Sequence, residues 1–290
     1  MTESKLPSQL QSTTPLDYFQ SLVADDAHFA LFEAAVCVAQ DEVPELDTQE
    51  VLAQVDALAR KLKSRLAADA APVQRLRMLS HYFFQELGFG GNVNDYYAPD
   101  NSYIHSVLST RRGIPITLAV LYMELASQVG LKVHGISFPG HFLVKCSMSQ
   151  GEVIIDPFSG RSLSREDLDE RLQPYRQQQG LVGDYEVPLG LFLQSAAPRD
   201  ILARLLRNLK EIHRMAQDWP RMLAVQERLV RVLPQDWQER RDRGLLHAEL
   251  EQWSAAAADL QAYLENMGDA PDASALNDRL QEVRRLAQLH

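Results

Sequence analysis

The sequence has 290 residues, enough for two domains, and its 46% hydrophobic and 23% charged residues are typical of a soluble globular protein. No run of eighteen apolar residues is present, so no membrane span is predicted. The net charge of −10 resides mainly in residues 1–198, which hold 15 basic and 24 acidic residues. This excess of acid disfavours nucleic acid binding, which depends on Lys and Arg replacing counterions.

The first part of the chain is predicted to be helical after a flexible tail, residues 1–14. That tail lacks the basic start and apolar core of a secretory signal, and the two cysteines form no disulfide framework, which together favour a cytoplasmic location. Apolar residues recur at helical spacing beyond the tail. This spacing predicts helices over residues 15–42, with a division at Asp25-Asp26, then over 48–69 and 72–87.

A segment rich in Gly, Asn and Asp follows, GFGGNVNDYYAPDNSYIHSVLSTRRG, and predicts a long loop over 88–113 with a short helix at 102–109. A long ordered loop ahead of a buried helix often shapes a cleft. Tyr96, Tyr97 and Tyr103 are then candidates to line that cleft, or alternatively they cover the edge of the core.

The segment from residue 111 to 158 predicts a buried helix followed by an antiparallel sheet. Pro115 suits the first turn of a helix over 114–128, which Gly130 ends. Alternating apolar residues predict three strands, over 131–137, 141–147 and 152–156, and Ser164 is expected to cap a helix over 165–176.

The order of helix, histidine and aspartate in this segment is that of a Cys-His-Asp site. His141 and Asp156 are 15 residues apart on neighbouring predicted strands, close enough to pair. A nucleophilic cysteine would stand at the start of the helix, where the dipole favours the thiolate. Pro115, Ile116 and Thr117 stand there instead, and a threonine nucleophile needs a strong adjacent base.

Other residues offer weaker candidates for chemistry. Cys146 is an odd offset from His141, which places the two on opposite faces of one strand. A metal site would draw on His105, His134, His141 and Asp156, but their spacing fits no standard ligand pattern, so we predict no metal and no cofactor. Arg111 and Arg112 either hold an anion in the cleft or pack against nearby groups.

After a predicted linker, 181–198, the pattern changes to a repeat. Trp219 and Trp253 are 34 residues apart, which is the tetratricopeptide period. Gly244 is expected where one repeat helix packs closely on the next. The pattern predicts two helical units, over 203–236 and 237–270, with a closing helix over 273–288, in an all-helical domain spanning 199–290.

Three stretches, RRGIPITLAVLYMELASQVGL, FPGHFLVK and IIDPFSG, resemble the bacterial SirB-type transglutaminase-like proteins, in which tetratricopeptide repeats follow the core. The resemblance implies an α+β fold, with a papain-like core over 15–180 and the repeats behind it. It also implies that His141 and Asp156 match the family's His and Asp. The family's cysteine position falls at Pro115 or Ile116.

Two functions follow from these patterns. The first is a non-catalytic, pseudoenzyme-like cytoplasmic regulator or adaptor, which binds a protein or peptide partner through the repeats and a cleft near Tyr96, Tyr103, Arg112 and Thr117. The alternative is a hydrolase or acyl transferase in which His141 acts as the base and Asp156 orients it. Neither hypothesis involves nucleic acid or a membrane.

Overall fold

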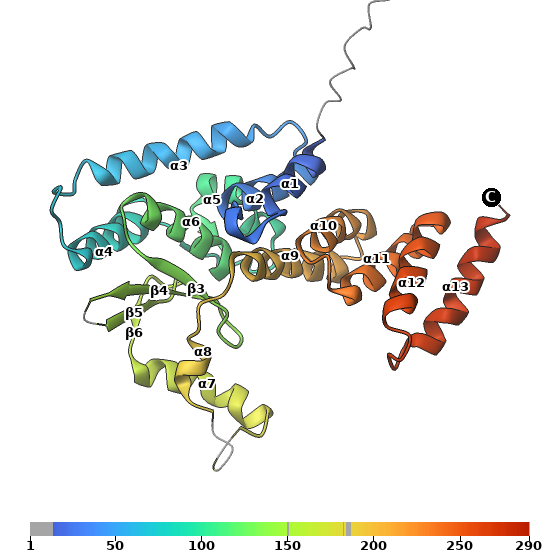
Figure 1. Cartoon of the computed structure of the whole chain (residues 1–290). Coiled ribbons are helices and arrows are strands. Elements are labelled where there is room, and N and C mark those ends of the chain that lie inside the picture. Colours follow the sequence, from blue (N-terminus) through green and yellow to red (C-terminus); the bar gives the residue numbers. More distant parts are fainter. Residues whose placement is uncertain (1–13, 150, 182, 184–186, 290) are drawn as a thin grey trace, which may run out of the picture.

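The computed structural model describes residues 14–149, 151–181, 183 and 187–289 (Figure 1). The predicted tail lies outside the described residues except for Thr14, and part of the predicted linker also lies outside them. Helices and a small sheet come first, and a row of helices then extends away from them (Figure 1). No helix in the described ranges is long and apolar enough to cross a membrane.

The predicted helix over 15–42 is divided at the aspartates, as the sequence indicated. The Thr14 hydroxyl accepts the Asp17 N–H and the Asp17 carboxylate accepts the Thr14 N–H, a reciprocal capping box. Asp25 then caps the next turn by accepting the Ala27 N–H. The elements of this region are α1 (Pro15–Val23), η1 (Asp26–His28), α2 (Leu31–Cys37), η2 (Val38–Asp41), α3 (Thr48–Lys63), α4 (Pro72–Ser80) and the π-helical η3 (His81–Glu86).

The predicted loop over 88–113 is closed at its base by two short strands. β1 (Gly90–Gly91) and β2 (Arg112–Gly113) pair in parallel. Between them lie the 3-10 turn η4 (Pro99–Ser102) and the short helix α5 (Ile104–Thr110), two residues later than the sequence predicted.

The central helix α6 (Pro115–Gln128) is the core of the first part of the chain. Ten of its residues are buried, and α2, α3, α4 and α5 all contact it. A helix that is apolar on all sides must be covered on all sides. Gly130 follows it with φ +74°, a left-handed conformation that glycine adopts without strain.

The sheet contains four antiparallel strands, β3 (Val133–Ile136), β4 (Leu143–Met148), β5 (Gly151–Ile155) and β6 (Ser162–Leu163), in that spatial order. The prediction of three strands missed β6, because two residues are too few to show alternation. The prediction that His141 opens a strand was wrong. Gly140 adopts φ +67° and the His141 N–H donates to the Phe138 carbonyl at 3.1 Å, so His141 lies in a turn.

The two faces of the sheet bury different side chains. Val144 and Cys146 belong to the core around α6, whereas Leu143 and Ile154 pack with Leu168 of α7 (Arg165–Gln178) on the other face. This alternation follows from the two-residue period of a strand. Ser164 caps α7 in a capping box, as the sequence predicted, and the short α8 (Leu189–Phe192) comes next.

Five helices complete the chain: α9 (Pro198–Met215), α10 (Trp219–Val232), α11 (Trp237–Glu249), α12 (Trp253–Asn266) and α13 (Ala273–Ala287). They run in sequence away from the sheet (Figure 1). The predicted close packing at Gly244 is confirmed, because a Cβ there would lie 3.1 Å from the Asp259 Cβ and from the Leu260 Cγ.

The first two of these helices pack against the N-terminal helices. Leu202 and Leu205 of α9, and Val225 and Leu229 of α10, are buried in the same hydrophobic core as α2 and α6. The last helices, α12 and α13, form a separate core with the end of α11. The first helical pair therefore extends the N-terminal core.

Candidate functional site

His141 and Asp156 meet at the end of the sheet. Val144 of β4 pairs with Ile155 of β5, so the turn before β4 lies beside the residue that follows β5. The His141 Nε2 atom is 2.8 Å from the Asp156 Oδ1 atom. The sheet thus brings together the two residues that the sequence predicted to pair.

The Asp156 carboxylate is almost completely enclosed, with 4% of its side chain exposed. Oδ1 also accepts the Phe158 N–H at 2.9 Å, and Oδ2 accepts the Ser159 hydroxyl at 2.9 Å and the Arg171 guanidinium at 3.1 Å. Burial by itself would raise the pKa of Asp156. The hydrogen bond and charge of His141, with the donors of Phe158 and Ser159, outweigh it and hold this pKa well below its usual range.

This carboxylate determines the tautomer of His141. An ionised carboxylate only accepts hydrogen bonds, so the proton of the bond must sit on Nε2. Nδ1 is therefore the nitrogen left to act as a base or acceptor, and among the described residues it has no hydrogen-bond partner. The side chain of His141 is 23% exposed. Orientation of an imidazole by a buried carboxylate is an arrangement that general-base catalysis uses.

The start of α6 provides no accessible nucleophile. Pro115, Ile116 and Thr117 are all buried, and the Thr117 side-chain oxygen lies within the protein without a hydrogen-bond partner among the described residues. A hydroxyl enclosed in this way cannot reach a substrate in this conformation.

Neither cysteine replaces the missing nucleophile. Cys146 lies within β4, paired with Val133 on one side and Val153 on the other, and Cys37 contacts the Thr48 hydroxyl at 3.9 Å. Both thiols are fully buried. Burial raises the pKa of each thiol, which disfavours the reactive thiolate.

Aromatic side chains border the pair on the side of the 88–113 loop. The Phe158 ring is close to both His141 and Tyr96, with ring centroids 6.4 and 6.0 Å away respectively. The Gly91 N–H donates to the Phe158 carbonyl at 2.9 Å, and a Cβ at Gly91 would lie 2.2 Å from the Phe158 ring. The loop thus approaches the pair closely because glycine occupies this position. Tyr96, at 41% exposed, is available to a ligand.

The other predicted binding residues lie elsewhere. Arg112 is exposed, and its guanidinium donates to the Gly88 carbonyl at 2.6 Å and to the Arg111 carbonyl at 3.0 Å, which secures the base of the loop. Arg111 stacks over the ring of Phe89, 4.6 Å from its centroid. Tyr103 is 4% exposed and forms no contact with the His141–Asp156 pair. It faces a separate cavity, described below.

The imidazoles considered as metal ligands do not converge. His134 is exposed on β3 opposite Lys145, and His105 lies on α5 beside Tyr103. Within the ranges that the structure describes, no three His, Cys, Asp or Glu side chains are arranged to hold a metal ion.

Sequence reasoning missed several residues that support the pair. Arg171 comes from α7, and Ser159 from the turn after β5. Arg204 on α9 donates to the His141 carbonyl at 2.8 Å and lies over the Phe142 ring, 5.4 Å from its centroid. The IIDPFSG motif offered a signal for Ser159. Arg204 is 63 residues from His141, and no local pattern connects them.

Comparison with known proteins agrees with this architecture. A family model described as the transglutaminase-like superfamily matches residues 49–207, and a tetratricopeptide repeat model matches residues 209–281. The first model covers more than half of the chain. No solved structure is significantly similar to this chain.

Several bacterial proteins are similar to the chain over most of its length. A UPF0162 protein of Xylella fastidiosa is 37% identical over 246 residues, which cover 83% of this chain and 85% of the relative. A UPF0162 protein of Pseudomonas aeruginosa is 30% identical over 88% of this chain and 91% of its own. Protein SirB1 of Salmonella typhimurium is 25% identical over 89% of this chain and 96% of its own.

Proposed function

Because this chain belongs to the transglutaminase-like superfamily, among the bacterial UPF0162 proteins, we propose that it is a non-catalytic regulatory or adaptor protein of the cytoplasm. In this proposal it binds a protein or peptide partner through its repeats and through the cleft beside His141. It acts without a metal or a cofactor.

The observation that carries the proposal is the start of α6. Acyl transfer by this type of site needs a thiolate next to the histidine. Here the chain supplies Pro115, Ile116 and the fully buried Thr117, and both thiols lie in the core. The orienting part of the site is present, but among the residues that the structure describes neither thiol and no group at the start of α6 is in place to form the covalent bond.

The His141–Asp156 pair also has a structural role. Asp156 ties together the turn that contains His141, the turn at Phe158 and Ser159, and helix α7 through Arg171. A carboxylate with four donors fixes these segments in one arrangement. We propose that this arrangement shapes a binding surface with Tyr96 at its edge.

The repeats support partner binding, because the tetratricopeptide model matches them and helical repeat arrays commonly bind protein segments. A line of ion pairs crosses their helices. Lys210 of α9 contacts Glu239 at 3.0 Å and Asp242 of α11 at 2.6 Å, and Arg241 contacts Asp272, before α13, at 2.7 Å. We propose that a partner segment binds along this charged line.

A charge reversal tests the partner surface. The test variant is Arg207→Glu, because Arg207 is half exposed and contacts Asp236 and Glu239. The matched control is Arg285→Glu, at an exposed position on α13. Partners captured by proximity labelling in a bacterial host should be lost with Arg207→Glu and kept with Arg285→Glu. Identical capture by all variants would contradict the proposed surface.

The alternative function is a hydrolase in which His141 acts as a base toward water. The observation that favours it is the bond from Nε2 to Asp156, which leaves Nδ1 as the free nitrogen. A panel of activated esters, amides and glutamine-containing peptides separates the two functions. The adaptor proposal expects no turnover above buffer. If the protein turned over one of these substrates and His141→Ala abolished that turnover, the hydrolase function would replace the adaptor proposal.

A further inference from the structure

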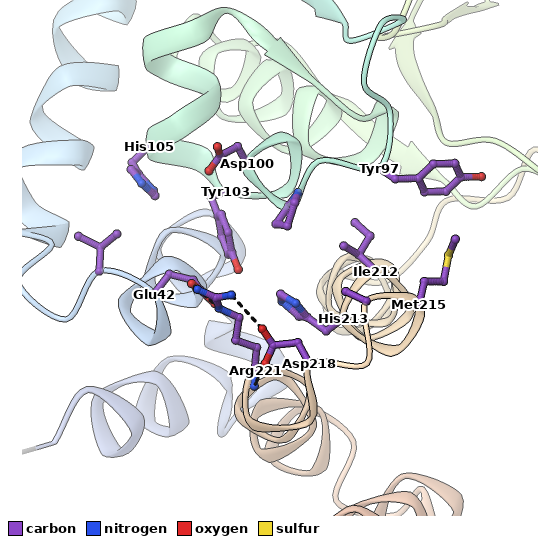
Figure 2. A pocket seen from close by; sticks show the side chains of 13 residues that line it. Glu42, Tyr97, Asp100, Tyr103, His105, Ile212, His213, Met215, Asp218 and Arg221 are labelled. Atoms are coloured by element: carbon purple, nitrogen blue, oxygen red, sulfur yellow. Dashed lines mark hydrogen bonds and ion pairs between the residues drawn. The ribbon is translucent and has the colours of Figure 1, made fainter.

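A cavity lies between the N-terminal part of the chain and the first two repeat helices, away from the His141–Asp156 pair. Its volume is about 510 Å³, and it lies where the end of η2, the η4–α5 segment and the junction of α9 with α10 come together (Figure 2). A cavity of this size suits a small molecule or one large side chain.

Two buried polar side chains point into this cavity with no partner. His213 of α9 is 3% exposed, and its Nε2 atom is enclosed without a hydrogen bond. Tyr103 is 4% exposed, and its hydroxyl forms no hydrogen bond with any described residue. Figure 2 shows both rings directed toward the same space. Since buried polar atoms are nearly always paired, the enclosed Nε2 atom of His213 indicates that a ligand supplies the missing partner. The Tyr103 hydroxyl is not fully enclosed, so it is accessible to the same ligand.

The charges around the cavity favour a cation. The carboxylates of Glu42, Asp100 and Asp218 border it, and Arg221 is the only Lys or Arg among its lining residues. Arg221 is already occupied, at 2.8 Å from Glu42 and 2.9 Å from Asp218. This leaves an excess of negative charge, whose field attracts a positive group.

His213 and Tyr103 are suited to receive such a group. Burial lowers the pKa of His213 and raises the pKa of Tyr103, so both side chains are neutral near neutral pH. A neutral imidazole with its proton on Nδ1 accepts a hydrogen bond at Nε2, and a phenol oxygen also accepts. The Tyr103 ring offers a π-face to a cation as well.

Apart from His105, the remaining walls are mainly apolar. Val43 and Ile212 line the interior, and Tyr97 and Met215 are 62% and 59% exposed at one end of the cavity (Figure 2). An apolar entrance leading to two neutral acceptors fits a ligand with a hydrophobic stem and a charged tip. Arginine and lysine side chains have this constitution, as do alkylamines and alkylguanidines.

We propose that this cavity binds an ammonium or guanidinium group carried on an apolar stem. The cation donates hydrogen bonds to His213 Nε2 and to the Tyr103 oxygen, and the stem lies between Ile212 and Met215. The proposal does not depend on the adaptor function, because none of these residues belongs to the site around His141.

Ligand titrations of the full chain test the charge requirement. The probes are n-hexylamine and n-hexylguanidine, with n-hexanol and hexanoate as neutral and anionic controls. Binding is followed by calorimetry and by the NMR signal of the His213 Cε1–H. The cations should bind and shift that signal, and the controls should do neither. Tighter binding of hexanol or hexanoate, or no shift with any probe, would overturn the proposal.

Two variants connect binding to the named atoms. Tyr103→Phe removes only the unpaired hydroxyl, so it should leave folding stability unchanged and weaken cation binding about tenfold, the effect of one hydrogen bond. Tyr175→Phe, on α7 and away from the cavity, is the control and should bind normally. His213→Leu should weaken binding further. If Tyr103→Phe bound the cations as well as the wild type, the assignment would be wrong.

The same assay identifies the source of the cation. The peptide acetyl-Leu-Arg-Leu-amide is compared with its glutamine counterpart and with hexylguanidine. Preference for the arginine peptide over hexylguanidine would indicate a protein segment, and the reverse would indicate a free metabolite. Equal binding of the arginine and glutamine peptides would contradict a cation site.

Discussion

Replacing Asp156 by asparagine tests whether this carboxylate holds the site together. The amide retains one oxygen, which can still accept from His141 and the Phe158 N–H, but its NH₂ group then faces Arg171, so donor meets donor. The charge that strengthened the bond from His141 is also lost. We expect Asp156→Asn to destabilise the fold while leaving its topology intact.

The magnitude follows from the contacts. A hydrogen bond to a charged group contributes about 1.5 to 3 kcal/mol, and the Arg171 pair adds about 0 to 1 kcal/mol because Arg171 is 36% exposed and screened. Asp156→Asn should therefore lower the free energy of unfolding by about 1.5 to 4 kcal/mol. Urea unfolding monitored by circular dichroism measures this, with Asp278→Asn, an exposed position on α13, as the control.

The effect of Asp156→Asn should also depend on pH. The pKa of Asp156 is lowered in the folded protein, so its contribution to stability is present above the unfolded pKa of about 3.9. That contribution is lost as the pH falls from there toward the folded pKa. The difference in free energy of unfolding between wild type and variant should thus be constant near neutral pH and should become smaller below about pH 4. A gap under about 1 kcal/mol at neutral pH would refute the reasoning.

Three further substitutions have definite expected outcomes. Gly91→Ala should cost about 1 to 3 kcal/mol of stability, because its Cβ would overlap the ring that lies beside His141. Arg228→Met should cost about 3 kcal/mol, since the buried guanidinium forms two hydrogen bonds, of 2.6 and 2.8 Å, to Asp41, which is left unpaired. Arg204→Met should cost about 1.5 kcal/mol, because one charged donor to the His141 carbonyl is lost. Chemical unfolding measures all three.

Matched controls accompany these substitutions. Gly90→Ala adds a Cβ whose nearest neighbour is 3.8 Å away, so it should be tolerated where Gly91→Ala is not. Adding Asp41→Asn to Arg228→Met should recover part of the loss, because no unpaired carboxylate remains. Arg285→Met is the control for Arg204→Met and should leave the free energy of unfolding unchanged, because Arg285 is exposed. Equal effects in variant and control would contradict the corresponding contact.

The sequence predicted the features that depend on neighbouring residues. The position of α6 follows from Pro115 and Gly130, and the start of α7 from Ser164. The contact of His141 with Asp156 was also foreseen, since two strands joined by a short turn have to lie side by side.

Features that depend on distant parts of the chain could not be predicted. Arg204 reaches the histidine turn from another helix, and nothing near it in the sequence indicates that partner. Tyr103 shared an aromatic loop with Tyr96, so both were expected beside one cleft. The turn at η4 separates them, and Tyr103 faces the cavity that His213 lines. That the side chains of Tyr103 and His213 lack hydrogen-bond partners among the described residues could be learned only from the three-dimensional structure.

The burial of α9 in the first core has a mechanical consequence. A partner that pulls on α12 or α13 would exert a force on α9. Leu202 and Leu205 of α9 are buried in the same core as α6, and Arg204 on the same helix donates a hydrogen bond to the carbonyl of His141. A force applied at the end of the repeats would thus be transmitted to the turn that contains His141 through helix α9. The two hydrophobic cores separate between α10 and α11, and polar contacts cross this junction, including the bond from Gln226 to Glu239 at 2.9 Å.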